Sequence, residues 1–274
     1  MKILITGANG YLGQGITKEL LDIGHIVIAS DIVCDKVDKR AIIKDCDLFN
    51  IDNPFEYFEQ PDAVLHCAWR NGFVHNDYSH ITDLSKHFMF LEKLINSGIK
   101  ELSVLGSMHE VGFFEGCVDE NTPTNPLSLY GISKNALRQA LQILCSSKDV
   151  TFKWLRGFYI IGNKEYGNSI FSKIYKAAKE NNKLFPFTTG KNKYDFLDYD
   201  IFCRYVAKTV SQNKVNGIIN ICSGEPIKLS EKVEQFIKDN ELDIKLDYGK
   251  FPDRPYDSKE LWGDNSKIKE IIGE

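Results

Sequence analysis

The chain has 274 residues, enough for one large domain or two interleaved ones, and its 43% apolar and 26% charged fractions are typical of a soluble globular protein. Its 34 basic and 38 acidic side chains give a net charge of −4, which argues against a protein that wraps nucleic acid or coats anionic lipid. Seven scattered cysteines without a C-x-x-C pair exclude a disulfide framework and a zinc ribbon, and they favour a reducing cytoplasm.

The N-terminal half alternates short apolar runs with helical patterns. The apolar runs predict buried strands at residues 2–6, 26–30, 63–68 and 101–105, and the helical patterns predict helices at 12–22, 81–97 and 130–146. Two helices carry apolar residues at three- and four-residue spacing: Ile81, Leu84, Phe88, Leu91 and Ile95, and Leu137, Ala140, Leu141 and Leu144. This alternation predicts an α/β fold with a doubly wound parallel sheet of Rossmann type.

Two further features bear on organisation and location. No apolar run reaches the ~18–20 residues of a membrane span, and the opening MKILITG shows no signal peptide, so we expect no membrane partner. Strands are also expected at 152–158 and 217–222, but after about residue 162 the segments between and beyond them are shorter, more polar and more irregular. We therefore predict a Rossmann domain of residues 1–162 and 194–223, with a small interleaved lobe of residues 163–193 and 224–274.

A glycine-rich turn, GANGYLG at residues 7–13, joins the first strand to the first helix. Small residues allow a tight turn and a close approach of the backbone to a pyrophosphate, while the helix start offers N–H groups and a positive dipole end. A second strand then ends at Asp31, at the distance expected for a carboxylate that binds the adenosine ribose. The alternative is an ordinary strand–turn–helix junction. The candidate dinucleotide ligands here are Gly7, Asn9, Gly10, Tyr11, Leu12, Gly13 and Asp31.

The carboxylate of Asp31 also favours one cofactor over another. It would repel a 2′-phosphate, so NAD is expected, with NADP as the alternative because Lys36, Lys39 and Arg40 follow closely. Those three residues otherwise form a solvated loop. Asp47 and Leu48 are candidates to flank the adenine, although Asp47 suits a turn cap equally well.

A Tyr-x-x-x-Lys pair, Tyr130 and Lys134, begins the helix that follows a turn-rich segment at residues 121–126. Chance predicts about one such pair in this chain, and a second pair, Tyr175 and Lys179, is interpreted as a solvated helix face. One helical turn separates Tyr130 from Lys134, so we expect the ammonium to lower the pKa of the phenol. Ser107 closes an upstream strand at the same edge of the sheet and would bond the reacting oxygen.

At this point the chain resembles the extended short-chain dehydrogenases/reductases of the nucleotide-sugar epimerase/dehydratase family. The motifs that carry the resemblance are residues 6–13, 65–68, 106–112, 130–134, 155–162, 194–197 and 220–225. The resemblance implies hydride exchange between a nicotinamide and a sugar carbon, with Tyr130 moving the proton, Lys134 holding the nicotinamide ribose and Ser107 polarising the carbonyl. It adds Cys67 and Ala68 to the cofactor-binding candidates. It also implies a homodimer formed through the helices at 81–97 and 130–146.

Departures from the family pattern narrow the reaction. The family's 4,6-dehydratases carry Asp-Glu directly after the serine or threonine, where this chain has Met108 and His109; many C4 epimerases carry an asparagine where it has Tyr159. With the short lobe, this favours a one-way reductase of a nucleotide-activated 4-keto-6-deoxyhexose. An NAD-dependent nucleotide-sugar C4 epimerase is the alternative, and Asp31 fits it well. A non-catalytic dinucleotide sensor is a third hypothesis, against which the intact Ser107, Tyr130 and Lys134 argue.

Several polar and aromatic residues are candidates to contact the substrate. They are Trp69, Ser107, Met108, His109, Asn168, Lys191 and Arg254. His109 would act as a second acid/base, but we favour a solvent-facing loop pair formed with Glu110. His66, inside an apolar run, is interpreted as a core histidine. The six histidines show no metal-ligand spacing with cysteine or carboxylate, so no metal is expected.

Overall fold

The computed structural model describes residues 1–162, 169–252 and 258–274. Its centre is a seven-stranded sheet in which all neighbouring strands run parallel. In spatial order the strands are β11 (Gly217–Ile221), β7 (Thr151–Gly157), β5 (Glu101–Ser107), β4 (Ala63–His66), β1 (Lys2–Thr6), β2 (Ile26–Asp31) and β3 (Ile42–Asp45). The order reverses beside β1, as in a doubly wound Rossmann fold, which confirms the predicted fold class.

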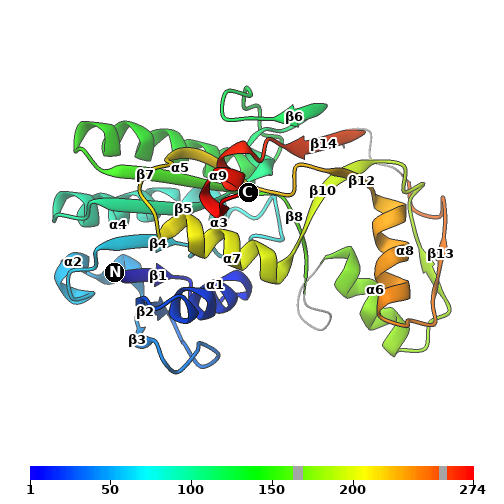
Figure 1. Cartoon of the computed structure of the whole chain (residues 1–274), viewed down its shortest axis with the longest axis horizontal. Helices are drawn as coiled ribbons and strands as arrows, with labels where there is room; N and C mark the ends of the chain where they lie inside the picture. Colours follow the sequence, from blue (N-terminus) through cyan, green and yellow to red (C-terminus); the bar gives the residue numbers. More distant parts are fainter. Residues whose placement is uncertain (163–168, 253–257) are drawn as a thin grey trace.

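Helices cover both faces of this sheet (Figure 1). One face carries α1 (Tyr11–Asp22), α7 (Tyr199–Val210) and α9 (Ser266–Ile272); the other carries α4 (Leu84–Asn96) and α5 (Leu129–Ser147). Because side chains alternate along a strand, Ile3 and Ile5 enter the first core and Leu4 enters the second. Short helical turns complete this unit: α2 (Pro54–Tyr57), α3 (Ser79–Thr82), η1 (Leu48–Asn50) and η2 (Met108–Glu110).

The helix predicted at residues 81–97 is in fact two helices, α3 and α4, which meet at Asp83. The buried Asp83 carboxylate forms ion pairs with Arg70 (2.5 Å) and Lys86 (2.9 Å). Ile81 lies before this break and is 44% exposed, so its place in the predicted apolar stripe was wrong. The buried face of α4 consists of His87, Phe90, Leu91, Leu94 and Ile95. On α5, the prediction is confirmed for Leu137 and Leu141.

A second, smaller sheet extends from the carboxyl edge of the first (Figure 1). Its strands are β12 (Pro226–Lys228), β10 (Lys193–Asp198), β14 (Glu260–Gly263) and β6 (Gly116–Val118), and β8 (Tyr159–Ile161) also pairs with β10. Residues 194–197, which the sequence placed in the Rossmann domain, thus belong to this second sheet. The buried Asp195 carboxylate holds the junction, because it accepts the backbone N–H groups of Ser223 (2.8 Å), Gly224 (2.9 Å) and Gly263 (3.2 Å).

The outer lobe is more regular than the sequence indicated. It contains α6 (Ile170–Lys179), β9 (Leu184–Pro186), α8 (Leu229–Asp239) and β13 (Lys245–Asp247), at the right of Figure 1. Its core includes Phe171, Ile174, Val233 and Phe236. The expectation of an irregular tail was wrong because charged residues separate these sparse apolar positions, which hides the helical period of α8.

Candidate active site

The glycine turn between β1 and α1 packs directly on the end of β4. Gly7 has φ +71°, and a Cβ on it would lie 2.6 Å from the backbone nitrogen of Ala68 and 2.9 Å from the carbonyl carbon of Cys67. A Cβ on Gly13 would lie 2.1 Å from the carbonyl oxygen of Gly7. Both positions therefore require glycine. The turn presents backbone at the carboxyl edge of the sheet, where a dinucleotide's phosphates need a close approach.

Asp31 lies beside this turn. Its carboxylate accepts the N–H of Asn9 (3.0 Å) and of Ile32 (2.8 Å). Gly10 is the N-cap of α1, and no side chain caps the helix, so the positive end of α1 faces the turn. Tyr11 and Leu12 open that helix. The arrangement fits a dinucleotide. The glycine turn allows a close approach, the N-terminus of α1 offers N–H donors, and the Asp31 carboxylate offers an acceptor.

Asp47 and Leu48 follow β3 at the same edge. Asp47 caps the short turn η1 by accepting the N–H of Phe49 (3.0 Å), which is the alternative role that the sequence left open. Leu48 is buried in the core beneath α4. In the neighbouring loop, Arg40 forms ion pairs with Asp22 (2.8 Å) and Asp38 (2.7 Å), so its guanidinium is already engaged.

Tyr130 stands in the first turn of α5, where aromatic side chains enclose its ring. The Ser128 hydroxyl caps this helix by accepting the N–H of Gly131 (3.1 Å), and the Tyr130 N–H donates to the carbonyl of His75 (2.9 Å). The His75 ring stacks on Tyr130, with centroids 5.5 Å apart and planes at 12°. The other rings around it are His80 (5.3 Å), His109 (6.1 Å) and Trp69 (6.2 Å).

This enclosure reverses one sequence prediction. Burial raises the pKa of Tyr130 to about 12, and the hydrogen bond with Ser107 opposes that rise only in part. The expected net lowering of this pKa was wrong because burial has the larger effect, although the Lys134 ammonium lies 6.0 Å from the centroid of the Tyr130 ring. Its Nζ donates to the carbonyl of Leu105 (2.8 Å) and lies 4.0 Å from the centroid of the Trp69 ring. Lys134 is only 3% exposed, and burial lowers its pKa to about 8.

Trp69 forms the wall beneath Lys134. Its indole N–H donates to His80 Nδ1 (3.0 Å), and its ring stacks on His87 with centroids 4.5 Å apart. His87 in turn bonds His66 (2.9 Å), which also bonds the Thr6 hydroxyl (2.8 Å). His66 is fully buried, which confirms the interpretation as a core histidine.

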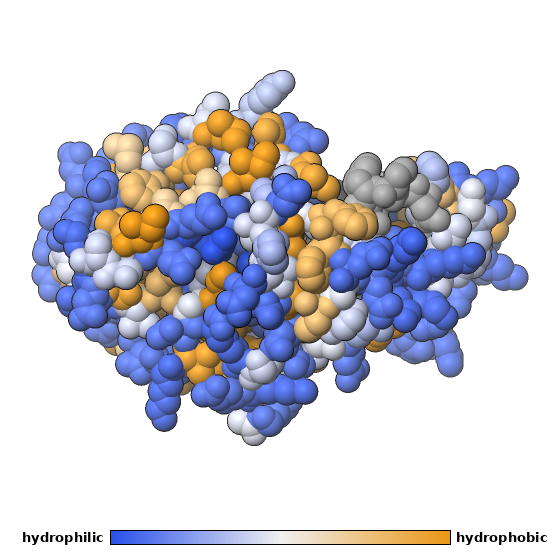
Figure 2. Space-filling model, turned by 90° about the horizontal axis from the view of Figure 1, so that it is seen from above, coloured by the Kyte–Doolittle hydropathy of each residue, from blue (hydrophilic) through white to orange (hydrophobic). Residues whose placement is uncertain are grey.

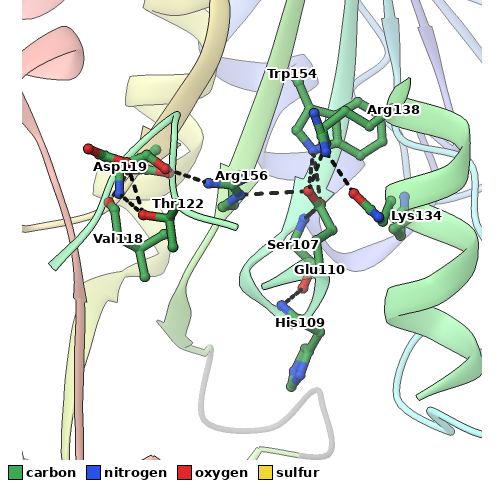
Figure 3. A network of polar contacts seen from close by, with 12 residues as sticks. Ser107, His109, Glu110, Val118, Asp119, Thr122, Lys134, Arg138, Trp154 and Arg156 are labelled. Atoms are coloured by element: carbon green, nitrogen blue, oxygen red, sulfur yellow. Dashed lines mark hydrogen bonds and ion pairs between the residues drawn. The ribbon is translucent and has the colours of Figure 1, made fainter. Parts of the chain in front are cut away.

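In the serine loop, the Glu110 side chain points toward Trp154 and Arg156 (Figure 3). The Glu110 side chain is fully buried and accepts the N–H of Ser107 (2.6 Å), while the Ser107 hydroxyl accepts the N–H of His109 (3.3 Å). The predicted solvent-facing pair of His109 and Glu110 was therefore wrong. The His109 ring lies 4.3 Å from that of His75, and burial lowers the pKa of His109 to about 4. Met108 packs against the small core under β6 and β14.

Of the remaining substrate candidates, the structure describes Lys191 alone. Lys191 is exposed in the turn between β9 and β10. Asn168 and Arg254 lie outside the described residues. Tyr175 and Lys179 are on α6 in the outer lobe, with the ammonium 5.5 Å from the ring centroid.

Sequence reasoning missed four residues of the cluster: His75, His80, His87 and Glu110. The crowding of four histidines into residues 66–87 was the available signal for the first three. Across the described ranges, no group of three or more His, Cys, Asp or Glu side chains is arranged to hold a metal ion. In those same ranges no helix has the length and apolar character needed to cross a membrane. Each of the seven cysteines is free.

The amino-acid sequence is similar to those of known proteins. A family model described as "NAD dependent epimerase/dehydratase family" matches residues 3–222. The chain is 43% identical over 272 residues to a dTDP-6-deoxy-L-talose 4-dehydrogenase (NAD(+)) of Aggregatibacter actinomycetemcomitans, covering 96% of this chain and 99% of the relative. It is 22% identical over 290 residues to a GDP-6-deoxy-D-talose 4-dehydrogenase of the same organism, covering 100% and 92%.

Solved structures share the fold at lower identity. The UDP-glucose 4-epimerase of Thermotoga maritima has a TM-score of 0.84 at 19% identity, covering 98% of this chain and 92% of that one. The UDP-glucuronic acid 4-epimerase of Bacillus cereus has a TM-score of 0.82 at 20% identity, covering 100% and 93%. These likenesses establish the architecture alone.

Proposed function

Because this chain belongs to the NAD-dependent epimerase/dehydratase family, we propose that it reduces the C4 carbonyl of a dTDP-activated 4-keto-6-deoxyhexose. It is an NAD-dependent enzyme that acts at C4 of a nucleotide sugar. The observation that carries the finer proposal is the 43% identity, over nearly the full length of both chains, to a protein named for oxidation of dTDP-6-deoxy-L-talose at C4. Oxidation at C4, run in reverse, is reduction of the 4-ketosugar.

The cofactor is NAD. The glycine turn and the N-terminus of α1 would hold its pyrophosphate, and Asp31 would bind the adenosine ribose, where a 2′-phosphate would meet the negative charge of the carboxylate. When bound in its reduced form, the cofactor supplies the hydride that the C4 carbon accepts.

The chain's own residues handle the proton and the developing charge. Tyr130 would donate its phenolic proton to the sugar O4 as hydride arrives, because a neutral phenol is the form that burial favours. Ser107 accepts a backbone N–H from His109, and its own proton would bond the carbonyl oxygen. Below pH 8 the Lys134 ammonium beside Trp69 keeps its positive charge and stabilises negative charge on the phenolic oxygen.

The residues after Ser107 favour reduction over dehydration. Elimination of water needs an acid and a base near C5 and C6, and the chain offers Met108 and His109 there. The low pKa of His109 keeps the imidazole neutral at pH 7, so it has no proton to give as an imidazolium. No carboxylate of the loop reaches solvent, since Glu110 is fully buried.

We assign the nucleotide-binding role to the lobe formed by residues 163–193 and 224–274. The support is the position of α6, β9, α8 and β13 at the carboxyl edge of the sheet, beyond β8 and β10 (Figure 1), where ligands of doubly wound sheets bind. Lys191 supplies an exposed cation in this lobe.

A homodimer through α4 and α5 is the proposed assembly. These helices carry exposed apolar side chains, including Met89 (55% exposed), Ile132 (43%) and Ile143 (74%). Seen from above, apolar side chains gather over the sheet-bearing part of the molecule while the outer lobe is mainly hydrophilic (Figure 2). Light scattering would report a dimer mass for the parent and a monomer mass for Ile143→Asp if this face pairs.

One assay separates the candidate activities. Purified protein is incubated with NADH and a dTDP-4-keto-6-deoxyhexose, and the loss of NADH absorbance is followed together with the sugar product. Stoichiometric NADH consumption supports the reductase. Interconversion of two C4 epimers without net NADH consumption identifies an epimerase, and NADH binding without turnover of any dTDP, UDP or GDP sugar identifies a sensor.

A further inference from the structure

A single buried carboxylate joins the two segments that carry the proton-transfer groups. Glu110 is fully buried, and its oxygens accept the N–H of Ser107 (2.6 Å) and the indole N–H of Trp154 (2.8 and 2.9 Å) (Figure 3). Its Oε2 also forms ion pairs with Arg138 (3.8 Å) and Arg156 (3.6 Å). Burial raises the pKa of Glu110, and the neighbouring cations and N–H donors oppose that rise by stabilising the ionised carboxylate.

The contacts of Glu110 connect three elements. Ser107 ends β5, Trp154 and Arg156 lie on β7, and Arg138 lies on α5 one helical turn beyond Lys134. A substitution at Glu110 should therefore shift both the serine loop and the helix that carries the tyrosine and lysine. The packing is close: a Cβ on Gly106 would lie 2.1 Å from the Trp154 indole nitrogen and 2.8 Å from Glu110 Oε1.

We propose that Glu110 is a positioning residue, which fixes the Ser107 hydroxyl relative to Tyr130 and Lys134 and supplies the negative charge that balances the buried cations behind them. This inference rests on the proposed C4 chemistry only for its kinetic consequences. The structural part, that the charge of Glu110 opposes the effect of burial on the pKa of Lys134, holds for any reaction at this site.

The charges around Glu110 predict the direction in which the pKa of Lys134 should change when the Glu110 charge is removed. Lys134, Arg138 and Arg156 are buried cations, and Glu110 is the carboxylate that contacts the two arginines. The negative charge of Glu110 raises the pKa of Lys134 and so opposes the effect of burial. Removing that charge should lower the pKa of Lys134 further. The other titratable groups facing Lys134 are Tyr130, Cys67, His66 and His87.

The test is Glu110→Gln, which keeps the volume and removes the charge. We expect kcat to fall about 10- to 100-fold while the KM for NADH stays the same, because the reacting groups shift relative to the substrate. The Lys134 titration should move to lower pH. Its readout independent of turnover is the pH dependence of Trp69 fluorescence, obtained as the difference between each protein and its Trp69→Phe counterpart.

Glu101→Gln is the matched control. Glu101 forms an ion pair with the buried Lys153 (3.2 Å) across the same two strands, β5 and β7, but at the opposite end of the sheet. We expect this variant to lose stability without any change in kcat or in the Trp69 titration. Glu110→Asp, which restores the charge on a shorter side chain, should return the titration toward that of the parent.

Two results for the Glu110→Gln protein would overturn the proposal. One is a Glu110→Gln protein with the parent's titration and kcat. The other is a loss of kcat that Glu101→Gln reproduces, which would make Glu110 a purely structural residue. If Glu110→Gln does not fold, the titration of Glu110→Asp decides, because a midpoint far from the parent's despite the retained charge contradicts the charge role. Failure of the parent to turn over any 4-ketosugar would overturn the proposed function and leave the titration result intact.

Discussion

Two regions lie at the carboxyl edge of the main sheet, and they differ in the chemical groups that form them. The turn between β1 and α1 presents backbone, and its requirement is the absence of a Cβ at Gly7 and Gly13. The cluster behind Tyr130 and Ser107 consists of buried charges and stacked rings. The first region is sensitive to added volume and the second to altered charge. Substitutions should therefore separate cofactor binding from proton transfer.

The largest effect is expected at Tyr130→Phe. Removing the phenolic proton should lower kcat by a factor of about 10²–10⁴, whereas NADH should bind with unchanged affinity because the glycine turn is untouched. Steady-state rates and NADH fluorescence titration measure the two quantities. Retained turnover in this variant would show that another group supplies the proton.

The converse substitution is Gly13→Ala, whose Cβ would lie 2.1 Å from the Gly7 carbonyl oxygen. Overpacking of this kind costs about 1–3 kcal/mol, so NADH should bind about 10- to 100-fold more weakly. Gly10→Ala is the matched control, since its Cβ would meet the same oxygen at 3.1 Å. Equal losses of NADH affinity in the two variants would contradict the steric account.

Asp31 places a negative charge beside the glycine turn. Asp31→Asn keeps an oxygen for the Asn9 N–H and removes the repulsion of a 2′-phosphate, so kcat/KM for NADPH should rise about tenfold relative to NADH. Asp35→Asn, which removes a charge from the same loop where Asp35 accepts the Asn9 side-chain amide (2.8 Å), should change that ratio less. A ratio that responds equally to both substitutions would remove Asp31 from the ribose site.

The smallest effect is expected at His109→Gln. Burial lowers the pKa of His109 to about 4, so the ring is neutral both in the parent and in its amide replacement at pH 5.5–7.5. The rate should fall less than about tenfold, through lost ring packing near Tyr130, and the pH profile in this range should keep its shape. A pH-dependent limb that disappears in the variant would identify His109 as a titrating acid or base.

The glycine region was predictable from sequence because its signals are local. A strand, a run of glycines and an acidic residue about twenty positions later lie within residues 2–31, and the parallel order of the sheet follows from alternation alone. The same holds for the pairing of Tyr130 with Lys134 on one helical face.

The charged region was only partly predictable, because its contacts join distant positions. Trp154 lies 44 positions from the Glu110 carboxylate that it bonds. The sequence shows Glu110 beside a histidine in a polar loop, a context in which exposure is the usual outcome. The split at Asp83 and the raised pKa of Tyr130 were hidden for the same reason: burial and ion pairing depend on the assembled fold.

The pairing of β6 with β14 has a consequence for folding during synthesis. Residues just beyond the serine loop complete their bonding only with partners near the other end of the chain, as where Phe114 N–H donates to Ser258, 144 positions away, and Asp264 N–H donates to Val118. A ribosome releases those partners well after the serine loop. The nascent polypeptide should therefore form its glycine turn well before its serine loop is secured.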